Sequence, residues 1–364
     1  MLDPNKLPRL QPKPADTREK KEKDAPAEQK PASFLKKKWI FLVAFVFVAS
    51  YFSLCLQGEH MLRQGIYRFF KDLGQEGLGV TFNAPSSYSD LKSGIDLDDL
   101  VVSAPERMGG WVLNTGKITV TSMPLSPRRI MMRLNGTHSL KTRTIGDIRL
   151  VVERGEAELR LPSGKNPLSF RLVLNKVQAA SPKSMEGFFL PRLELTVTRD
   201  AENVKNGTLR FSLTADAVHL PAFISSHLPP VAEKIDLDGV VSGVPDEPVS
   251  FLTGWLNRSG TVEIEKGDIV WPPFSARLNG TFGFNKSFEM IGAGVAKTYG
   301  FFDLLDMLQN GDYLRPRRVS VAKVVLGEQV RKDKGQTDAL TAAFSIQSGK
   351  IYTGPVLLYD NHEK

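Results

Sequence analysis

The stretch RLELTVT, from Arg192 to Thr198, places a leucine or a valine at every second position, with polar residues between them. PLSFRLVL, from Pro167 to Leu174, and TLRFSLT, from Thr208 to Thr214, also carry an apolar residue at every second position. Because successive side chains of a strand point to opposite faces, each stretch predicts a strand with one apolar and one polar face. Such strands are typical of antiparallel sheets with one face toward water.

The pentapeptide RLNGT occurs twice, at Arg133 to Thr137 and at Arg277 to Thr281, and the match extends outward at a constant separation of 144 residues. The residues that recur in this frame are Trp111 and Trp255, Gly116 and Gly260, Asn135 and Asn279, and Gly136 and Gly280. Self-similarity at a fixed period indicates repeated architecture. We therefore predict a mainly β protein with two duplicated antiparallel β units, residues 78–215 and 216–364. We expect the two units to form either a curved groove or sandwiches, and we expect one or two short helices in addition to the strands.

Within each unit, RLNGT predicts a β-hairpin turn, because Asn-Gly tolerates the positive φ angles of a two-residue type I′ turn. The two tryptophans are expected to anchor the cores of the units. A competing interpretation is N-glycosylation, because five asparagines lie in N-x-S/T patterns. These are Asn135, Asn206, Asn257, Asn279 and Asn285.

The N-terminal segment, residues 1–38, carries 11 Lys or Arg and 6 Asp or Glu, which supplies +5 of the chain's net charge of +8. Its composition predicts a disordered, basic cytosolic tail. The uncharged run WIFLVAFVFVASYFSLCL follows at residues 39–56 and includes Trp39, Phe47 and Leu56. At 1.5 Å per residue it spans about 27 Å and predicts a single transmembrane helix. The lysines at residues 36–38 place the N-terminus in the cytosol.

Two further segments show the apolar spacing of amphipathic helices. The first, residues 57–77, predicts a helix that either lies near the membrane surface or caps the core of the outer domain. Its apolar residues are Leu62, Ile66, Phe69, Phe70 and Leu73. The second, YGFFDLLDMLQNGDY, should lie against the sheet and close one end of its apolar face. Its apolar residues are Phe301, Leu304, Leu305 and Leu308.

Patterns for catalysis are weak throughout the chain. The five histidines are scattered, without the cysteine or acidic neighbours that a metal site needs. SDLK, at Ser89 to Lys92, has the S-x-x-K form of acyl-enzyme nucleophiles but lacks their partner motifs. We therefore expect no catalytic residue, no cofactor and no metal, and we expect that the protein is not an enzyme.

Two basic clusters are interpreted either as solvated loop charges or as contacts for phosphate head groups. They lie at Arg128 and Arg129 and at Arg315, Arg317 and Arg318. Neither cluster has the interleaved aromatic residues that stack nucleic-acid bases, and an exported domain meets no nucleic acid, so no nucleic-acid partner is expected.

Three stretches carry a resemblance to a known family: WLNRSGTVEIEKGDIVWPPFSARLNGTFGFN, GFFDLLDMLQNG and SIQSGKIYTGPVLL. In this order they resemble the alphaproteobacterial membrane-anchored family catalogued as domain of unknown function 2125, over about Trp39 to Leu358. Trp271-Pro272-Pro273 departs from the Trp-Gly-Pro of that family. More distantly, one N-terminal anchor before repetitive antiparallel β structure is similar to AsmA-like envelope proteins. That resemblance implies a curved sheet whose apolar inner face holds lipid acyl chains.

Together, these patterns and resemblances lead to two functional hypotheses. The first is a single-pass bacterial inner-membrane protein whose periplasmic β domain binds or transfers lipid in envelope maintenance. Its candidate lipid-facing residues are Leu195, Phe211, Phe301, Leu304, Leu305 and Leu308. The second is a non-enzymatic scaffold of the envelope that interacts with protein partners. An apolar strand face open to a ligand favours the first hypothesis, and a sealed face favours the second.

Overall fold

The chain divides into two compact units, Met1–Ala49 and Ser50–Lys364, and every strand belongs to the second. In the computed structural model, the described backbone comprises residues 32–75, 77–87, 93–106, 110–142, 146–163, 167–180, 187–199, 207–221, 228–244, 255, 259–285, 289–328, 330–333 and 336–360. Side chains are described over the same ranges except at residues 32–44 and 331–338. The first 31 residues of the predicted tail, the SDLK motif, Asn206 and Asn257 lie outside the described residues.

Helix α1 runs from Ala32 to Gln75, so it begins inside the predicted tail and joins the two segments that the sequence predicts as separate helices. The predicted transmembrane segment starts at Trp39, whose side chain is not among the described ones. Two of its later residues, Phe47 and Leu56, are exposed. Within the part of the chain whose side chains are described, no helix is both long enough and apolar enough to cross a membrane.

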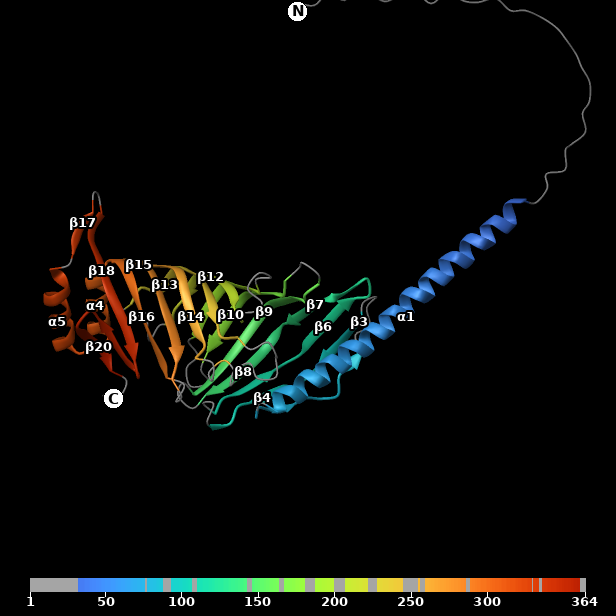
Figure 1. The fold of residues 1–364 in the computed structure, drawn as a ribbon, viewed down its shortest axis with the longest axis horizontal. Helices are drawn as coiled ribbons and strands as arrows, with labels where there is room; N and C mark the ends of the chain where they lie inside the picture. Colours follow the sequence, from blue (N-terminus) through green and yellow to red (C-terminus); the bar gives the residue numbers. More distant parts are fainter. Residues whose placement is uncertain are drawn as a thin grey trace, which may run out of the picture. The chain divides into compact units, whose positions relative to one another are not determined.

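The centre of the second unit is a run of long antiparallel strands, each hydrogen-bonded to its neighbour in the order of the chain (Figure 1). The three alternating stretches lie in the first three of these strands, as predicted. The strands are β10 (Ser169–Ala180), β11 (Gly187–Thr198), β12 (Leu209–His219), β13 (Val231–Ser242), β14 (Thr261–Trp271), β15 (Phe274–Phe284), β16 (Met290–Tyr299) and β18 (Gln336–Gln347).

Toward the N-terminus the sheet forks at strand β9 (Gly146–Arg160), whose two halves pair with two different strands. One branch leads through β7 (Ser126–Leu134), β6 (Ile118–Met123), β3 (Ser93–Leu97) and β2 (Ser86–Ser87). The other leads through β8 (Gly136–Thr142), β5 (Val112–Thr115), β4 (Leu100–Ser103) and β1 (Gly79–Thr81). The fork gives the sheet two apolar surfaces that face one core.

The C-terminal half of α1 closes the forked end. Leu62, Ile66, Phe70 and Leu73 pack into a core with Ile95 and other residues of both branches. Of the two interpretations of residues 57–77, this contact matches the helix that caps the core. Phe69 is the exception among the predicted apolar residues, because it is exposed.

Two helices cover the apolar face at the opposite end of the sheet (Figure 1). Helix α4 (Phe301–Asn310) follows β16, lies within the stretch that the sequence predicts as a helix, and ends before Gly311. Helix α5 (Pro316–Gly327) packs beside it, and its Val319, Ala322 and Leu326 are buried. The remaining strands at this end are β17 (Arg331–Asp333), β19 (Lys350–Thr353) and β20 (Val356–Asp360). Among the described strands β20 pairs with β19 alone, so it forms the edge of the sheet.

The prediction that RLNGT forms a hairpin turn is wrong at both positions. Asn135 separates β7 from β8, but these strands do not pair with each other, because each pairs with β9. Gly136 has a φ of 104°, and the Asn135 side chain accepts a hydrogen bond from the Gly155 backbone N–H, so the first copy marks the fork. Asn279 and Gly280 lie inside the continuous strand β15.

The two copies also pair in different registers. Val120 pairs with Met132 in the first copy, whereas Ile264, which is 144 residues after Val120, pairs with Gly280 rather than with Ala276. The predicted boundary between residues 215 and 216 falls inside β12, which pairs on both sides. The described residues therefore show one open sheet rather than two equivalent units.

Candidate functional site

The candidate site is the apolar face of the sheet, where the pairing register aligns apolar residues from strand to strand. The middle row crosses twelve strands, each member paired with the next. It consists of Ile95, Val120, Met132, Ala157, Leu172, Leu195, Leu213, Leu237, Gly267, Leu278, Ala296 and Ala342. At about 4.8 Å between neighbouring strands, this row is roughly 53 Å long.

Two flanking rows widen the apolar face. The first flanking row runs from Ile130 to Phe344 and includes Phe211, and all of its members are apolar residues or glycines. The other connects Gly155 to Leu340, and Thr298 is its single polar member. The Thr298 hydroxyl donates to the Leu340 carbonyl, so it is already satisfied. The face therefore offers hydrocarbon contact without a free hydrogen-bonding side chain in these rows.

The large side chains in the middle of the apolar face are more exposed than those at its ends. The row begins in the core beneath α1, where Ile95 and Val120 are buried, and ends in the core beneath α4 and α5, where Ala342 is buried. Between these cores, the large side chains of Leu195 and Leu213 are half-buried, whereas the small residues Ala157 and Gly267 are buried. The cluster at the centre consists of sheet residues, among them Ala215 and Ala232, with no helix residue among its described members.

Large side chains on this face lie over glycines of the neighbouring strands. A Cβ atom at Gly239 would lie 2.8 Å from the Phe211 ring, and one at Gly294 would lie 2.8 Å from the Phe344 ring. Leu278 covers Gly267 in the same way. Because the space over each glycine is filled from the side, the face stays continuous without the bulk of a side chain at every position.

Ion pairs follow the opposite face of the same strands. Glu194 accepts hydrogen bonds from Arg171 and Arg192, and these bonds hold the pKa of the Glu194 carboxyl below its usual value. Asp268 forms ion pairs with Arg277 and Lys266, and these contacts lower the pKa of the Asp268 carboxyl. Exposed pairs of this kind contribute little stability. They do keep this face charged and hydrated, which leaves the other face as the apolar one.

The structure places the predicted lipid-facing residues in two different environments. Leu195 and Phe211 lie half-buried in the rows of the apolar face. Leu305 is only 1% exposed and, with Phe301 packed against it, belongs to the core between α4, α5 and the sheet. The prediction that Leu305 faces lipid is therefore wrong, because protein atoms cover it. Leu304 and Leu308 are half-buried on α4.

The residues of the repeat frame have structural contacts. The indole nitrogen of Trp255, which is 6% exposed, donates to the Ser242 carbonyl at 2.7 Å. Its ring fills the space over Gly260, where a Cβ atom would lie 2.1 Å from Nε1. Trp111 is half-buried before β5. A Cβ atom at Gly116 would lie 2.9 Å from the Thr137 carbonyl oxygen, so this glycine allows a close approach of the backbone.

Helix α1 approaches the forked end closely. The Ser93 hydroxyl donates to the Cys55 carbonyl at 2.9 Å, and a Cβ atom at Gly58 would lie 2.3 Å from Ser93 Oγ. Glu59 accepts a hydrogen bond from the Ser87 hydroxyl, which lowers the pKa of the Glu59 carboxyl. These contacts fix the part of α1 after residue 50 beside the beginning of the apolar row.

The described part of the chain shows no candidate metal site. No three His, Cys, Asp or Glu side chains lie together there in an arrangement that could hold a metal ion. His227 and His362 lie outside the described residues, as does the SDLK motif. The His219 ring lies beside the Phe189 ring, tilted by 51°, with 5.5 Å between the ring centroids.

His138 on β8 is buried, with 7% of its surface exposed, and its Nε2 atom has no hydrogen-bond partner among the described residues. Burial lowers its pKa, and a hydrogen bond with the Leu134 backbone opposes this effect. The unfolded chain therefore binds a proton at a higher pH than the folded chain does. The contribution of neutral His138 to the free energy of unfolding is fully present above about pH 6.5, the usual pKa of histidine. It is lost as the pH falls through the lower pKa that His138 has in the folded chain.

We expect urea unfolding to show a fall in the free energy of unfolding between pH 7.5 and pH 5.5. In the variant His138→Leu this fall should be smaller, because no group at this position then binds a proton. The measurement is a set of urea titrations at three pH values. An equal fall in both proteins would show that another group is responsible.

Comparison with known proteins identifies one family. Residues 91–359 match the family model described as "Uncharacterized protein conserved in bacteria (DUF2125)". No curated protein and no solved structure matches the chain. The matched range includes the fork at β9, the whole apolar face and both C-terminal helices.

Proposed function

Because this chain belongs to the DUF2125 family, whose description names no activity, we propose from its own residues that the apolar face binds lipid acyl chains. The observation that carries this proposal is the register itself, which aligns apolar residues across twelve strands on one face of an open sheet. Burial of apolar surface is the driving force, at about 25 cal/mol per Å².

The chemistry of the face favours an acyl chain over a peptide or a sugar. A peptide backbone or a sugar brings hydrogen-bonding groups, and leaving such a group unpaired against an apolar surface costs about 1–3 kcal/mol. An acyl chain brings none. One leaflet of a bilayer core is about 15 Å thick, so a row of roughly 53 Å has room for several chains side by side or in sequence.

The proposal extends to the membrane. The uncharged run at residues 39–56, preceded by the lysines at residues 36–38, supports a single-pass anchor in the bacterial inner membrane with the sheet on the periplasmic side. Residues 55–73 of α1 dock on the forked end, so an anchored helix would hold the beginning of the apolar row near the bilayer. Lipid could then enter the row without crossing water, and no covalent step is needed.

Photo-crosslinking in living bacteria tests this function with the full-length chain. Phe211 and Ser212 are neighbours on β12 that lie on opposite faces of the sheet. A photoreactive phenylalanine analogue at position 211 is expected to form lipid adducts that mass spectrometry detects, whereas the same analogue at position 212 is not. Equal adduct formation at both positions, or none at position 211, would contradict lipid binding and would favour the scaffold hypothesis.

A further inference from the structure

The hairpin between β6 and β7 presents apolar side chains to solvent at its tip, which consists of Met123, Pro124 and Leu125. Met123 is exposed, and 80% of the surface of Leu125 is exposed. Leu161, whose backbone N–H donates to the Arg128 carbonyl, is a third exposed apolar residue beside this hairpin. Apolar residues that are exposed together, rather than singly, mark contact surfaces.

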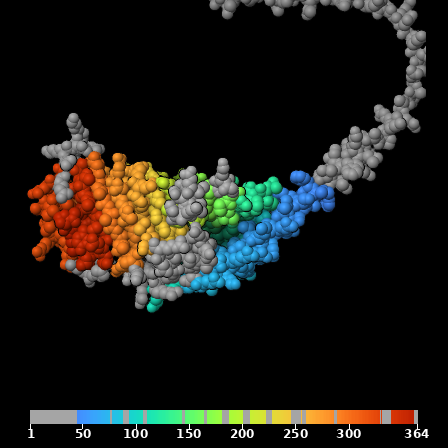
Figure 2. All heavy atoms as spheres, viewed as in Figure 1, coloured from blue at the N-terminus to red at the C-terminus, as the bar shows by residue number. Residues whose placement is uncertain are grey.

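The hairpin belongs to the branch of the sheet that runs alongside α1. The Ser93 hydroxyl of β3 donates to the Cys55 carbonyl, and the Ser87 hydroxyl donates to Glu59. Ser87 pairs with Ile95 of β3, so β3 and the part of α1 after residue 50 advance in the same direction. Figure 1 shows β3, β6 and β7 beside this helix, and Figure 2 shows the surface of α1, in blue, against the blue-green surface of the first strands.

The hairpin tip lies level with the apolar part of α1. Strand β6 returns along β3, and its Ser122 pairs with Ser93, so Ser122 lies near the level of Cys55. The turn begins two residues after Ser122, about 7 Å farther at about 3.4 Å per residue. Along a helix, about 7 Å is the rise of four to five residues, so the tip lies roughly level with residues 50–51. These residues are part of the uncharged run at residues 39–56.

Basic residues follow the apolar tip. Arg128 and Arg129, one of the two basic clusters found in the sequence, are exposed at the beginning of β7. Arg129 and Arg160 share one carboxylate, Glu158, so two positive charges meet one negative charge. Arg128 donates to the Pro162 carbonyl, a contact that does not neutralise its charge. An apolar surface bordered by excess positive charge is typical of segments that enter the interface of an anionic membrane.

We infer that the hairpin tip enters the interface of the bilayer that holds the run at residues 39–56. The inference rests on the proposed membrane anchor and adds a second membrane contact to it. Met123 and Leu125 then lie among the glycerol and first methylene groups, and Arg128 lies level with the lipid phosphates. The tip extends about 7 Å beyond Ser122, and interfacial segments enter a bilayer by about 5–10 Å. Since β6 and β7 also carry two members of the middle row, this contact holds the beginning of the apolar face toward the bilayer.

Spin labels on the full-length chain test this contact in vesicles of phosphatidylethanolamine and phosphatidylglycerol. Cys55→Ser removes the single native cysteine, and Leu125→Cys supplies the labelling site. The label is expected to collide several-fold more often with dissolved oxygen than with a nickel chelate, because oxygen concentrates in the bilayer and the chelate stays in water. The matched control is Val324→Cys on α5, where 72% of the valine surface is exposed, and its label should show the reverse preference.

The role of the arginines is tested in the chain labelled at position 125. In the double variant Arg128→Gln, Arg129→Gln, collisions of this label with the chelate should increase several-fold, because the attraction to the anionic surface is lost. The matched control, Arg171→Gln, Arg192→Gln, removes two arginines from the polar face of the sheet and should leave the collisions unchanged. Equal effects of the two double variants would overturn the role of the arginines.

A third label, at Leu54→Cys, separates failure of the hairpin contact from failure of the anchor. If the label at position 54 reports the bilayer while the label at position 125 reports water, the hairpin contact is overturned and the anchor stands. Labels that report water at both positions would overturn the anchor as well. A label at position 125 that neither reagent reaches would indicate a protein contact and would also contradict the inference. Adducts at position 211 report separately on acyl-chain binding.

Discussion

Replacing Leu195 with glutamate is expected to reduce lipid adducts at position 211 by about tenfold or more, because a carboxylate beside an acyl chain loses its hydration without gaining a partner. Leu195 lies in the middle of the row, paired with Leu172 on one side and Leu213 on the other. Both neighbours are aliphatic and half-buried, so neither can compensate the charge. The measurement is the adduct yield in cells, relative to the amount of protein.

The matched control for this variant is Thr196→Glu. Thr196 is the next residue of β11, on the polar face, where a new carboxylate stays hydrated and lies beside the Arg171–Glu194 ion pair. Circular dichroism must show that both variants are folded. If Leu195→Glu unfolds the chain, Leu195→Ser replaces it, since this change removes apolar area without adding a charge. Unchanged adducts in a folded Leu195→Glu or Leu195→Ser protein would rule out the apolar face as the lipid site.

Local patterns predicted the elements of this fold where one physical preference dominates. The alternation in RLELTVT identified β11 because half of its side chains must face an apolar surface. The apolar spacing from Phe301 to Leu308 identified α4 in the same way. Helix α5 was not predicted, because PRRVSVAKVVLG is rich in valine, and valine favours strands unless tertiary contacts decide otherwise. Those contacts bury Val319, Ala322 and Leu326.

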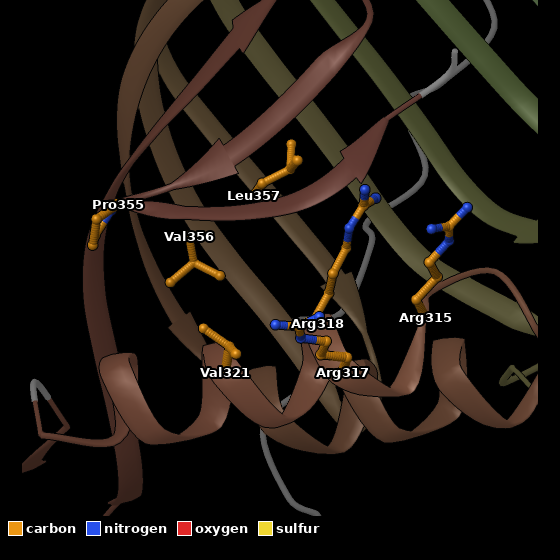
Figure 3. A pocket seen from close by; sticks show the side chains of 7 residues that line it. All are labelled: Arg315, Arg317, Arg318, Val321, Pro355, Val356 and Leu357. Atoms are coloured by element: carbon orange, nitrogen blue, oxygen red, sulfur yellow. The ribbon is translucent and has the colours of Figure 1, made fainter. Parts of the chain in front are cut away.

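The site depends on relations that no single stretch contains. Leu195 was a candidate from its own strand, but the continuous row requires the register of eleven pairings between strands. A cavity between α5 and β20, shown in Figure 3, likewise has Arg318 and Leu357 in its lining, although they are 39 positions apart in the chain. The repeat misled for a related reason. RLNGT is the same in both copies, yet different partners make it a fork at Asn135 and a strand interior at Asn279.

The shape of the apolar face also depends on its glycines, and Gly239 on β13 is one of them. A Cβ atom there would lie 2.2 Å from the Glu263 carbonyl oxygen and 2.8 Å from the Phe211 ring. The ring could move, but the carbonyl belongs to the neighbouring strand β14 and is part of the ladder. A side chain at this position must therefore separate two strands or distort the bulge between Asp238 and Gly239.

Gly239→Ala is consequently expected to lower the free energy of unfolding by about 3 kcal/mol, the upper part of the range for overpacked sites. Urea unfolding followed by circular dichroism measures this change. The matched control is Gly65→Ala on α1, where a Cβ atom has no neighbour within 4 Å. It should stabilise the chain by about 0.5–1 kcal/mol, because alanine favours a helix over glycine. Equal effects of the two substitutions would contradict the close approach of β13 and β14. The added volume should also displace Phe211, so any Gly239→Ala protein that remains folded should give fewer lipid adducts there.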